Sequence, residues 1–202
     1  MKNIIFDFGG VIINLDISST LKAFEDIGIK EIANSTRHYY RDPVFNKYEV
    51  GKVSDQEFRD VVKTLSDRSI SDEEINSAWT KMLLDIPKDR VDFILELKKK
   101  YRVFLLSNTN LIHQKQFEPY FLNLYKFPFP DLFEQIYYSH VEGIRKPNAE
   151  AFTNVLTKSN LEAEETLFVD DSLDNIKKAK ELGFHTYHIQ PGYVLDDILG
   201  AF

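Results

Sequence analysis

The stretch "IIFDFGGVI" (residues 4–12) decides how this sequence is best interpreted. It is an apolar run typical of a buried strand, broken by one carboxylate, Asp7, with two glycines close behind. Four further runs of strand-forming residues follow along the chain. Together with a first strand at 3–8, they predict strands at 102–108, 134–139, 166–171 and 184–189.

Helical patterns separate most of these strands, at residues 89–100, 149–159 and 173–182, and Gly183 follows the last of them as a stop signal. Strands that alternate with helices of this length form right-handed βαβ crossovers, which build a parallel sheet with helices on both faces. We therefore predict an α/β fold with a Rossmann-like parallel sheet as its core.

The stretch from residue 16 to 88 has a different character. It contains no convincing strand, but two capping-box signatures, "SDQE" from Ser54 and "SDEE" from Ser71, each predict the start of a helix. We interpret this stretch as a helical cap inserted after the first strand. The expected domains are an α/β core, residues 1–15 and 89–202, and a helical cap, residues 16–88.

The composition restricts the class of protein. The 202 residues carry a net charge of −7 and no cysteine, which excludes disulfides and thiolate metal sites and argues against a nonspecific nucleic-acid binder. The first apolar run is interrupted by Asp7, and no window approaches the roughly 20 apolar residues that a membrane span needs. We expect a cytoplasmic protein, a monomer or small homo-oligomer, that binds neither membranes nor nucleic acid.

Polar side chains stand at the carboxyl ends of the predicted strands. The first strand ends at Asp7, and the second ends at Ser107 and Asn108. In an open parallel sheet these ends meet at one edge, where ligands bind near the reversal of strand order. We therefore expect one cluster at this edge, and its further members are Thr109, Asn110, Arg145, Lys146, Asp170, Asp171 and Ser172.

Taken in order, the segments "FDFGGVI", "LLSNTN", "GIRKP" and "FVDDSLDNI" resemble the four motifs of the haloacid dehalogenase superfamily of hydrolases, which are chiefly phosphatases. The match runs along essentially the whole chain. It is most similar to the branch with a helical cap after the first motif, which includes the bacterial α-D-glucose-1-phosphate phosphatase and the N-terminal phosphatase domain of soluble epoxide hydrolase. The resemblance implies a hydrolase that cleaves small phosphate monoesters.

The resemblance also assigns a role to each motif. Asp7 is implied as the nucleophile that attacks phosphorus and forms an aspartyl-phosphate, which divides one hard displacement into two. Ser107 would hold phosphate oxygens, and Lys146 would neutralise charge and keep Asp7 ionised, so these three are the expected catalytic residues. Backbone that closely approaches a metal and a phosphate favours residues without Cβ. The expected substrate-binding residues are Gly9, Gly10, Ser107, Asn108, Arg145 and Lys146.

A divalent cation completes this set. An anionic nucleophile and a phosphate repel each other, so we expect a hard, oxygen-binding cation between them. Mg²⁺ fits because few carboxylates and some waters suffice to hold it. The implied ligands are the side chains of Asp7 and Asp171 and the backbone carbonyl of Gly9, with Asp170 close by or linked through water.

Gly9 departs from the superfamily pattern, because most of its phosphatases carry a second Asp here that protonates the leaving oxygen. A 2-haloacid dehalogenase needs no such acid, but it needs no metal either, and the pair Asp170 and Asp171 argues against it. A phosphate-ester-binding or regulatory protein with little turnover is a second alternative. The third is a phosphatase for a good leaving group, such as a hexose 1-phosphate, and the glucose-1-phosphate phosphatase also has glycine at this position.

Two further features concern the leaving group and the substrate. Asp16 could replace the missing acid, although a position at the start of a helix explains this residue better. The aromatic stretch 38–52, which begins with His38, Tyr39 and Tyr40, is a candidate surface for facing the substrate. Its aromatic residues also fit a core between cap helices.

Overall fold

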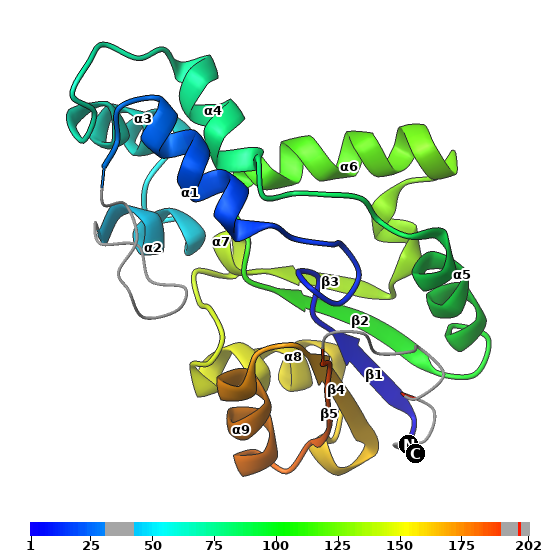
Figure 1. Ribbon diagram of the computed structural model, residues 1–202. Coiled ribbons are helices and arrows are strands. Elements are labelled where there is room, and N and C mark those ends of the chain that lie inside the picture. The colour runs from blue at the N-terminus through cyan, green and yellow to red at the C-terminus, as the bar shows by residue number, and fades with distance from the viewer. Residues whose placement is uncertain (31–42, 191–197, 199–202) are drawn as a thin grey trace.

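The computed structural model describes residues 1–30, 43–190 and 198. These residues form a five-stranded parallel sheet in the order β3-β2-β1-β4-β5 (Figure 1). Helices pack on both faces of the sheet, so the predicted α/β, Rossmann-like fold is confirmed. The strands are β1 (Asn3–Phe6), β2 (Arg102–Ser107), β3 (Gln135–Tyr138), β4 (Thr166–Asp170) and β5 (His185–His188).

The strands form where the sequence supplies continuous apolar runs. Every residue of β1 and of β4 is buried, as expected of strands that are covered on both faces. Neighbouring side chains of β1 point to opposite faces, so Ile4 and Phe6 join one apolar cluster and Ile5 joins the other. Because β1 lies between β2 and β4, the strand order reverses at its carboxyl end, which is where such sheets bind ligands.

Two pairs of helices cover the sheet. On one face, α5 and α6 contribute Val91 and Phe117 to the apolar cluster. On the other face, α8 and α9 contribute Phe152 and Ile176. These helices are α5 (Lys88–Leu97), α6 (Leu111–Tyr125), α8 (Ala149–Ser159) and α9 (Leu173–Glu181).

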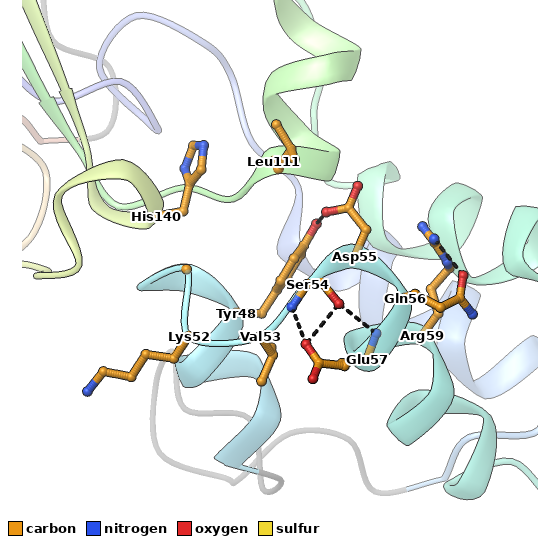
Figure 2. Close-up of a pocket in the computed structure, with 11 residues that line it drawn as sticks. Tyr48, Lys52, Val53, Ser54, Asp55, Gln56, Glu57, Arg59, Leu111 and His140 are labelled. Atoms are coloured by element: carbon orange, nitrogen blue, oxygen red, sulfur yellow. Dashed lines mark hydrogen bonds between the residues drawn. The ribbon is translucent and has the colours of Figure 1, made fainter.

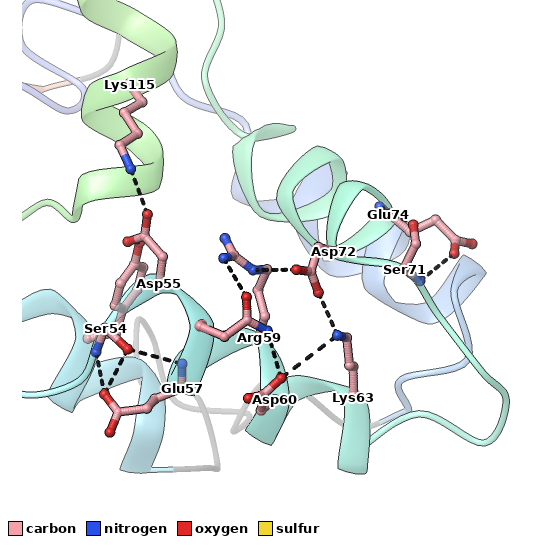
Figure 3. Close-up of polar contacts among 12 residues, drawn as sticks. Ser54, Asp55, Glu57, Arg59, Asp60, Lys63, Ser71, Asp72, Glu74 and Lys115 are labelled. Atoms are coloured by element: carbon pink, nitrogen blue, oxygen red, sulfur yellow. Dashed lines mark hydrogen bonds and ion pairs between the residues drawn. The ribbon is translucent and has the colours of Figure 1, made fainter.

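Helices α1 to α4 form a separate layer beyond the carboxyl ends of the strands (Figure 1). Both predicted capping boxes are present (Figure 3): the Glu57 N–H donates to Ser54 Oγ at 3.2 Å, the Ser54 N–H donates to Glu57 Oε2 at 2.7 Å, and Ser71 and Glu74 repeat this pattern. The reciprocal bonds satisfy backbone donors that a helix start leaves open. The four helices are α1 (Ile17–Asp26), α2 (Pro43–Glu49), α3 (Asp55–Thr64) and α4 (Asp72–Thr80).

A buried aromatic cluster holds this helical layer together. The Trp79 ring of α4 lies 6.0 Å from Phe24 of α1, 5.3 Å from Phe45 of α2 and 5.6 Å from Phe58 of α3, measured between ring centroids. Large aromatic side chains bury much area and dominate the energetics of such cores. The four helices therefore share one apolar centre.

The first turn of α6 joins the helical layer to the helices of the sheet. Ile112 packs into the aromatic cluster, and the His113 ring stacks on Trp79 with its Nε2 2.9 Å from the Trp79 carbonyl oxygen. Burial lowers the pKa of His113 to about 4, so the ring is neutral at pH 7 and its Nε2–H donates to that carbonyl. The two parts of the fold thus meet in a buried contact.

Polar contacts also join the helical layer to α6, beside a pocket lined by Tyr48, Asp55 and Leu111 (Figure 2). The Tyr48 hydroxyl of α2 donates to Asp55 Oδ1 at 2.7 Å and accepts from the backbone N–H of Ile112 at 3.0 Å. Asp55 also pairs with Lys115 of α6 at 2.8 Å. One tyrosine and one aspartate therefore connect α2, α3 and α6.

Helix α6 has no counterpart among the predicted helices. Pro119 lies inside it, and Leu122 and Leu124 are exposed, so the apolar residues do not mark one face. Its start is well defined, because Asn110 caps the helix by accepting from the His113 N–H at 3.0 Å. The remaining short elements are η1 (Phe129–Leu132), α7 (Ser139–Glu142) and η2 (Ala163–Glu165).

None of the helices in the described part of the chain is both long and apolar enough to cross a bilayer.

Candidate active site

Asp7 occupies the position just beyond β1. Its N–H donates to the Val169 carbonyl at 2.8 Å, which continues the ladder between β1 and β4. Phe6 pairs with Val169 in register, so Asp7 and Asp170 leave the sheet side by side. Ser107 ends the neighbouring strand β2 and is buried. The fold therefore brings the predicted first, second and fourth motifs to one edge.

Lys146 lies between two of these carboxylates. Its side chain is 1% exposed, and Nζ donates to Asp7 Oδ1 and to Asp170 Oδ2, each at 2.7 Å. Burial acts to lower the pKa of Lys146, but the charges of Asp170 and Asp7 outweigh burial and raise the pKa above its usual value. The lysine is therefore a permanent buried cation in direct contact with the predicted nucleophile.

Asp170 is completely buried and accepts several hydrogen bonds. In addition to Lys146, it accepts from the Ser172 N–H at 2.7 Å and from Asn175 Nδ2, which lies 3.1 Å and 3.0 Å from its two oxygens. Asn175 is not among the residues that the sequence predicted for the site. Asn175 lies in the first turn of α9. Only the fold shows that its side-chain amide points back to the Asp170 carboxylate.

Three carboxylates gather at this edge. One oxygen from each of Asp7, Asp170 and Asp171 lies within 4.8 Å of the others. Burial raises the pKa of Asp7 to about 7; Lys146 opposes this rise, and Asp170 and Asp171 add to it. Such a group of hard oxygen donors fits Mg²⁺, whose charge would offset the repulsion among the carboxylates.

The glycine turn after Asp7 leaves room for this cluster. Gly10 has φ +72°, and a Cβ built on it would lie 2.5 Å from Asp171 Oδ2. Only glycine combines this backbone conformation with so close an approach. Gly9 lies in the same turn, and its carbonyl as a metal ligand stays a prediction.

Asn108 binds the peptide of Lys146 with both ends of its amide. The Lys146 N–H donates to Asn108 Oδ1, and Asn108 Nδ2 donates to the Lys146 carbonyl, each at 2.9 Å. The side chain of Asn108 thus holds the lysine loop, which leaves backbone N–H groups near it as the candidates for binding phosphate oxygens.

Arg145 extends from the same loop to the helical layer. Its Nε lies 3.1 Å from Glu49 Oε2, and its Nη1 donates to Asn46 Oδ1 at 2.9 Å. Both partners belong to α2. The predicted contact of Arg145 with the substrate stays a prediction, and the guanidinium is already engaged by α2.

Leu15 lies where a side chain at position 9 would project. A Cβ on Gly9 would come 2.7 Å from Leu15 Cδ1.

Asp16 caps α1: its Oδ1 accepts from the Ser19 N–H at 3.2 Å, and its Oδ2 accepts from the Ser19 hydroxyl at 2.6 Å. The interpretation of Asp16 as a helix-start residue is confirmed.

The predicted substrate-facing stretch is only partly visible. His38, Tyr39 and Tyr40 lie outside the described residues. Phe45 and Tyr48 are buried in the helical layer, which agrees with their interpretation as core.

Comparison with known proteins places this geometry in a family. The model of the hydrolase family described as haloacid dehalogenase-like hydrolase matches residues 1–183. The chain belongs to the haloacid dehalogenase-like hydrolases. The predicted family is therefore confirmed.

Several relatives match over nearly the full length. The D-ribitol-5-phosphate phosphatase of Bacteroides thetaiotaomicron is 37% identical over 193 residues, which are 95% of this chain and 93% of the relative. A haloacid dehalogenase family enzyme of the same species, solved with magnesium and inorganic phosphate, is 36% identical with a TM-score of 0.89 over 98% of each chain. A haloacid dehalogenase-like hydrolase structure from Porphyromonas gingivalis is 31% identical with a TM-score of 0.85, covering 99% of this chain and 97% of that one.

These findings confirm the predicted enzyme class, a phosphatase of this family, and the similar enzyme of known structure was solved with magnesium, which agrees with the predicted cofactor. The cluster of Asp7, Asp170 and Asp171 fits that cofactor independently. The finer resemblance to the glucose-1-phosphate phosphatase stays a prediction.

Proposed function

We propose that this haloacid dehalogenase-like phosphatase hydrolyses small polyol and sugar phosphate monoesters, with Asp7 as nucleophile. The observation that carries the proposal is the buried Lys146, held 2.7 Å from both Asp7 and Asp170 beyond the strand ends. The full-length similarity to a D-ribitol-5-phosphate phosphatase supports an open-chain or cyclic polyol phosphate as the substrate class.

In the proposed reaction, the free carboxylate oxygen of Asp7 attacks phosphorus in line with the leaving oxygen. The ester P–O bond breaks, and the leaving alkoxide keeps the electron pair and takes a proton from water. A second water then attacks the phosphorus of the aspartyl-phosphate, which restores Asp7 and releases inorganic phosphate. Magnesium would supply positive charge between the nucleophile and the phosphate.

The residues around Asp7 would stabilise the charge that spreads over the phosphoryl oxygens. Lys146 contributes a buried cation whose position is fixed by Asp170 and Asn108. Ser107 would donate its hydroxyl to one phosphoryl oxygen, and the N–H groups next to Asn108 would donate to others. Groups that are already in place cost no reorganisation in the transition state, so each contributes more than it would in water.

We also propose that residues 16–88 act as the cap of a core formed by 1–15 and 89–202. The aromatic cluster gives helices α1 to α4 an apolar centre separate from the two clusters on the sheet. Leu15 and Leu83, at the two connections, pack against both this centre and the core cluster. A layer in this place would exclude water from the phosphate and select the substrate.

A panel of substrates tests the proposal. Purified protein is given D-ribitol 5-phosphate, glucose 1-phosphate and p-nitrophenyl phosphate with and without Mg²⁺, and chloroacetate without metal. We expect phosphate release only with Mg²⁺, fastest on a polyol or sugar phosphate, and none from Asp7→Asn. Chloride release from chloroacetate would establish the dehalogenase alternative. Binding of phosphate esters without turnover would establish the regulatory alternative.

The leaving group distinguishes two candidate substrates. Gly9 supplies no acid, and Leu15 fills the space beside it, which favours substrates whose leaving oxygen is easily released. If this effect dominates, glucose 1-phosphate is hydrolysed faster than ribitol 5-phosphate. The opposite order would show that contacts with the polyol chain outweigh the leaving group.

A further inference from the structure

The contact between Arg145 and α2 connects the lysine loop to the helical layer. The side chains of Arg145 and Glu49 are 21% and 20% exposed, and Arg145 Nε lies 3.1 Å from Glu49 Oε2. Asn46, one turn earlier on α2, accepts from Nη1 at 2.9 Å. One directional hydrogen bond to Asn46 and an ion pair with Glu49 thus tie the guanidinium to α2.

Arg145 immediately precedes the catalytic lysine in sequence. The peptide of Lys146 is bound on both sides by Asn108, and its Nζ is bound by Asp7 and Asp170. Because Arg145 is joined to Lys146 by one peptide bond, a shift of its backbone would pull against these four bonds and lengthen them. Small displacements of a catalytic group have large effects on rate.

The carboxyl end of α2 also contacts α7, and through α7 it is linked to the loop that follows β2. The Ser139 hydroxyl donates to the Glu49 carbonyl at 2.6 Å and accepts from the Thr109 N–H at 2.9 Å. Gly51 lies so close to α7 that a Cβ on it would collide with the carbonyl oxygen of His140. The end of α2 is thus seated on α7 and on the loop of Lys146, and Ser139 links it to the loop that follows β2.

Charge makes the Arg145 contact difficult to replace. Burial raises the pKa of Glu49, and the guanidinium of Arg145 opposes this rise. Removing the arginine would leave a half-buried carboxylate without its compensating cation, whereas Glu49→Gln keeps the shape and removes only the charge. The pair can therefore be weakened without removing α2 from its place.

We propose that Arg145 is a positioning residue, which Glu49 and Asn46 hold so that Lys146 reaches its catalytic place only when α2 is seated on the core. This inference rests on the proposed function and extends it, since it makes the catalytic lysine sensitive to the position of the cap. It gives Arg145 a role through Lys146 in place of a direct contact with phosphate.

Kinetics on the variants Glu49→Gln, Arg145→Gln, Arg145→Lys and the double variant Glu49→Gln/Arg145→Gln test the proposal. With saturating Mg²⁺ and p-nitrophenyl phosphate, we expect kcat to fall by at least about tenfold in each single Gln variant, with KM changed by less than about threefold. The double variant should be no slower than Arg145→Gln, because both changes break the same contact. Arg145→Lys, which keeps the charge but not the fork, should retain an intermediate kcat.

Hydrogen exchange gives a second measurement that needs no turnover. The Lys146 N–H is bonded to Asn108, so we expect its exchange to become about tenfold faster in Glu49→Gln and Arg145→Gln, because the loop is released locally. Arg102→Gln is the matched control: it breaks the pair with Glu134 at the amino end of β2 and should change neither kcat nor the exchange of Lys146.

The outcomes separate the inference from the function on which it rests. A wild-type protein that hydrolyses no phosphate ester would remove the proposed function, while hydrogen exchange would still decide the role of Arg145. A raised KM with unchanged kcat would show that Arg145 binds the substrate instead. Unchanged kcat and unchanged exchange in all variants would overturn the positioning role.

Discussion

At the scale of single residues, Asp7 links metal binding to pH. Its carboxyl pKa in the metal-free protein is raised to about 7, first by burial. Between its ordinary pKa of 3.8 and about 7, Asp7 is therefore protonated in the folded protein and ionised in the unfolded chain. The folded state binds more protons in this window, so the stability contributed by this group falls as pH rises through it. Mg²⁺ must displace the proton that the folded state holds.

We therefore predict that Mg²⁺ binds more weakly at pH 6 than at pH 8, by about tenfold for each pH unit below the pKa of Asp7. Calorimetric titration with MgCl₂ at several pH values measures this dependence. In Asp7→Asn the affinity should be low at every pH and should lose its slope. An affinity of the wild-type protein that does not change between pH 6 and pH 8 would contradict the assignment of Asp7 as a ligand.

Gly10 provides a second prediction at this scale. In Gly10→Ala, the new Cβ would displace Asp171, whose Oδ2 lies 2.5 Å from its position, so we expect Mg²⁺ affinity to fall by about 10–100-fold. Gly183→Ala is the control, because Gly183 has φ +88° but its Cβ would meet only Ala163 at 3.8 Å. Both variants should lose similar stability from backbone strain, and only Gly10→Ala should lose the metal. Equal Mg²⁺ affinity in the two would place Asp171 outside the site.

At the scale of elements, the start of α1 contains Asp16, the residue that could replace the general acid missing at Gly9. Asp16 accepts from the N–H and the hydroxyl of Ser19, which explains the residue as a helix cap. We predict that Asp16→Ala lowers the melting temperature and changes kcat by less than about threefold, far below the 10²–10⁴ typical of a general acid. Thermal unfolding and steady-state kinetics on one preparation measure both. A loss of about a hundredfold in kcat would instead identify Asp16 as the acid.

The elements also show which kinds of structure this sequence predicts well. The strands could be predicted because each is a short apolar run. Helices α3 and α4 could be predicted because a serine and a glutamate at fixed spacing cap their first turns. Helix α6 could not be predicted, because Pro119 and exposed leucines interrupt the helical spacing of its apolar residues, and only Asn110 marks its start. Propensity is a weak signal when packing against two different partners decides the element.

The site residues also divide into those whose place the sequence predicts and those whose role only the fold shows. Asp7 and Asp170 lie side by side because they stand at the carboxyl ends of neighbouring parallel strands, and Lys146, which follows β3 and α7, contacts both. Ser107 ends the strand on the other side of β1. The roles of Asn175 and Asn108 depend on which way an amide turns, and no spacing in the sequence encodes that. Side chains that hold other side chains are therefore visible only once the fold is known.

At the scale of the whole molecule, the helical layer and the sheet share buried contacts. Ile112 and His113 of α6 pack into the cluster around Trp79, and Leu15 and Leu83 contact both sides. Breaking such a contact exposes apolar surface on both parts, so the loss of one destabilises the other. We therefore predict that the two parts unfold in a single transition.

Trp79 makes this prediction measurable, because it is the one tryptophan of the chain and lies at the centre of the helical layer. Unfolding by urea should give the same midpoint by Trp79 fluorescence as by far-UV circular dichroism, which reports every helix and strand. Tyr48→Phe removes the hydroxyl that joins Asp55 to the Ile112 N–H, and it should shift both midpoints together, by about 1–2 kcal/mol in the free energy of unfolding. A fluorescence transition at lower urea than the dichroism would instead show that the layer unfolds alone, and a cap that opens independently would then explain substrate entry.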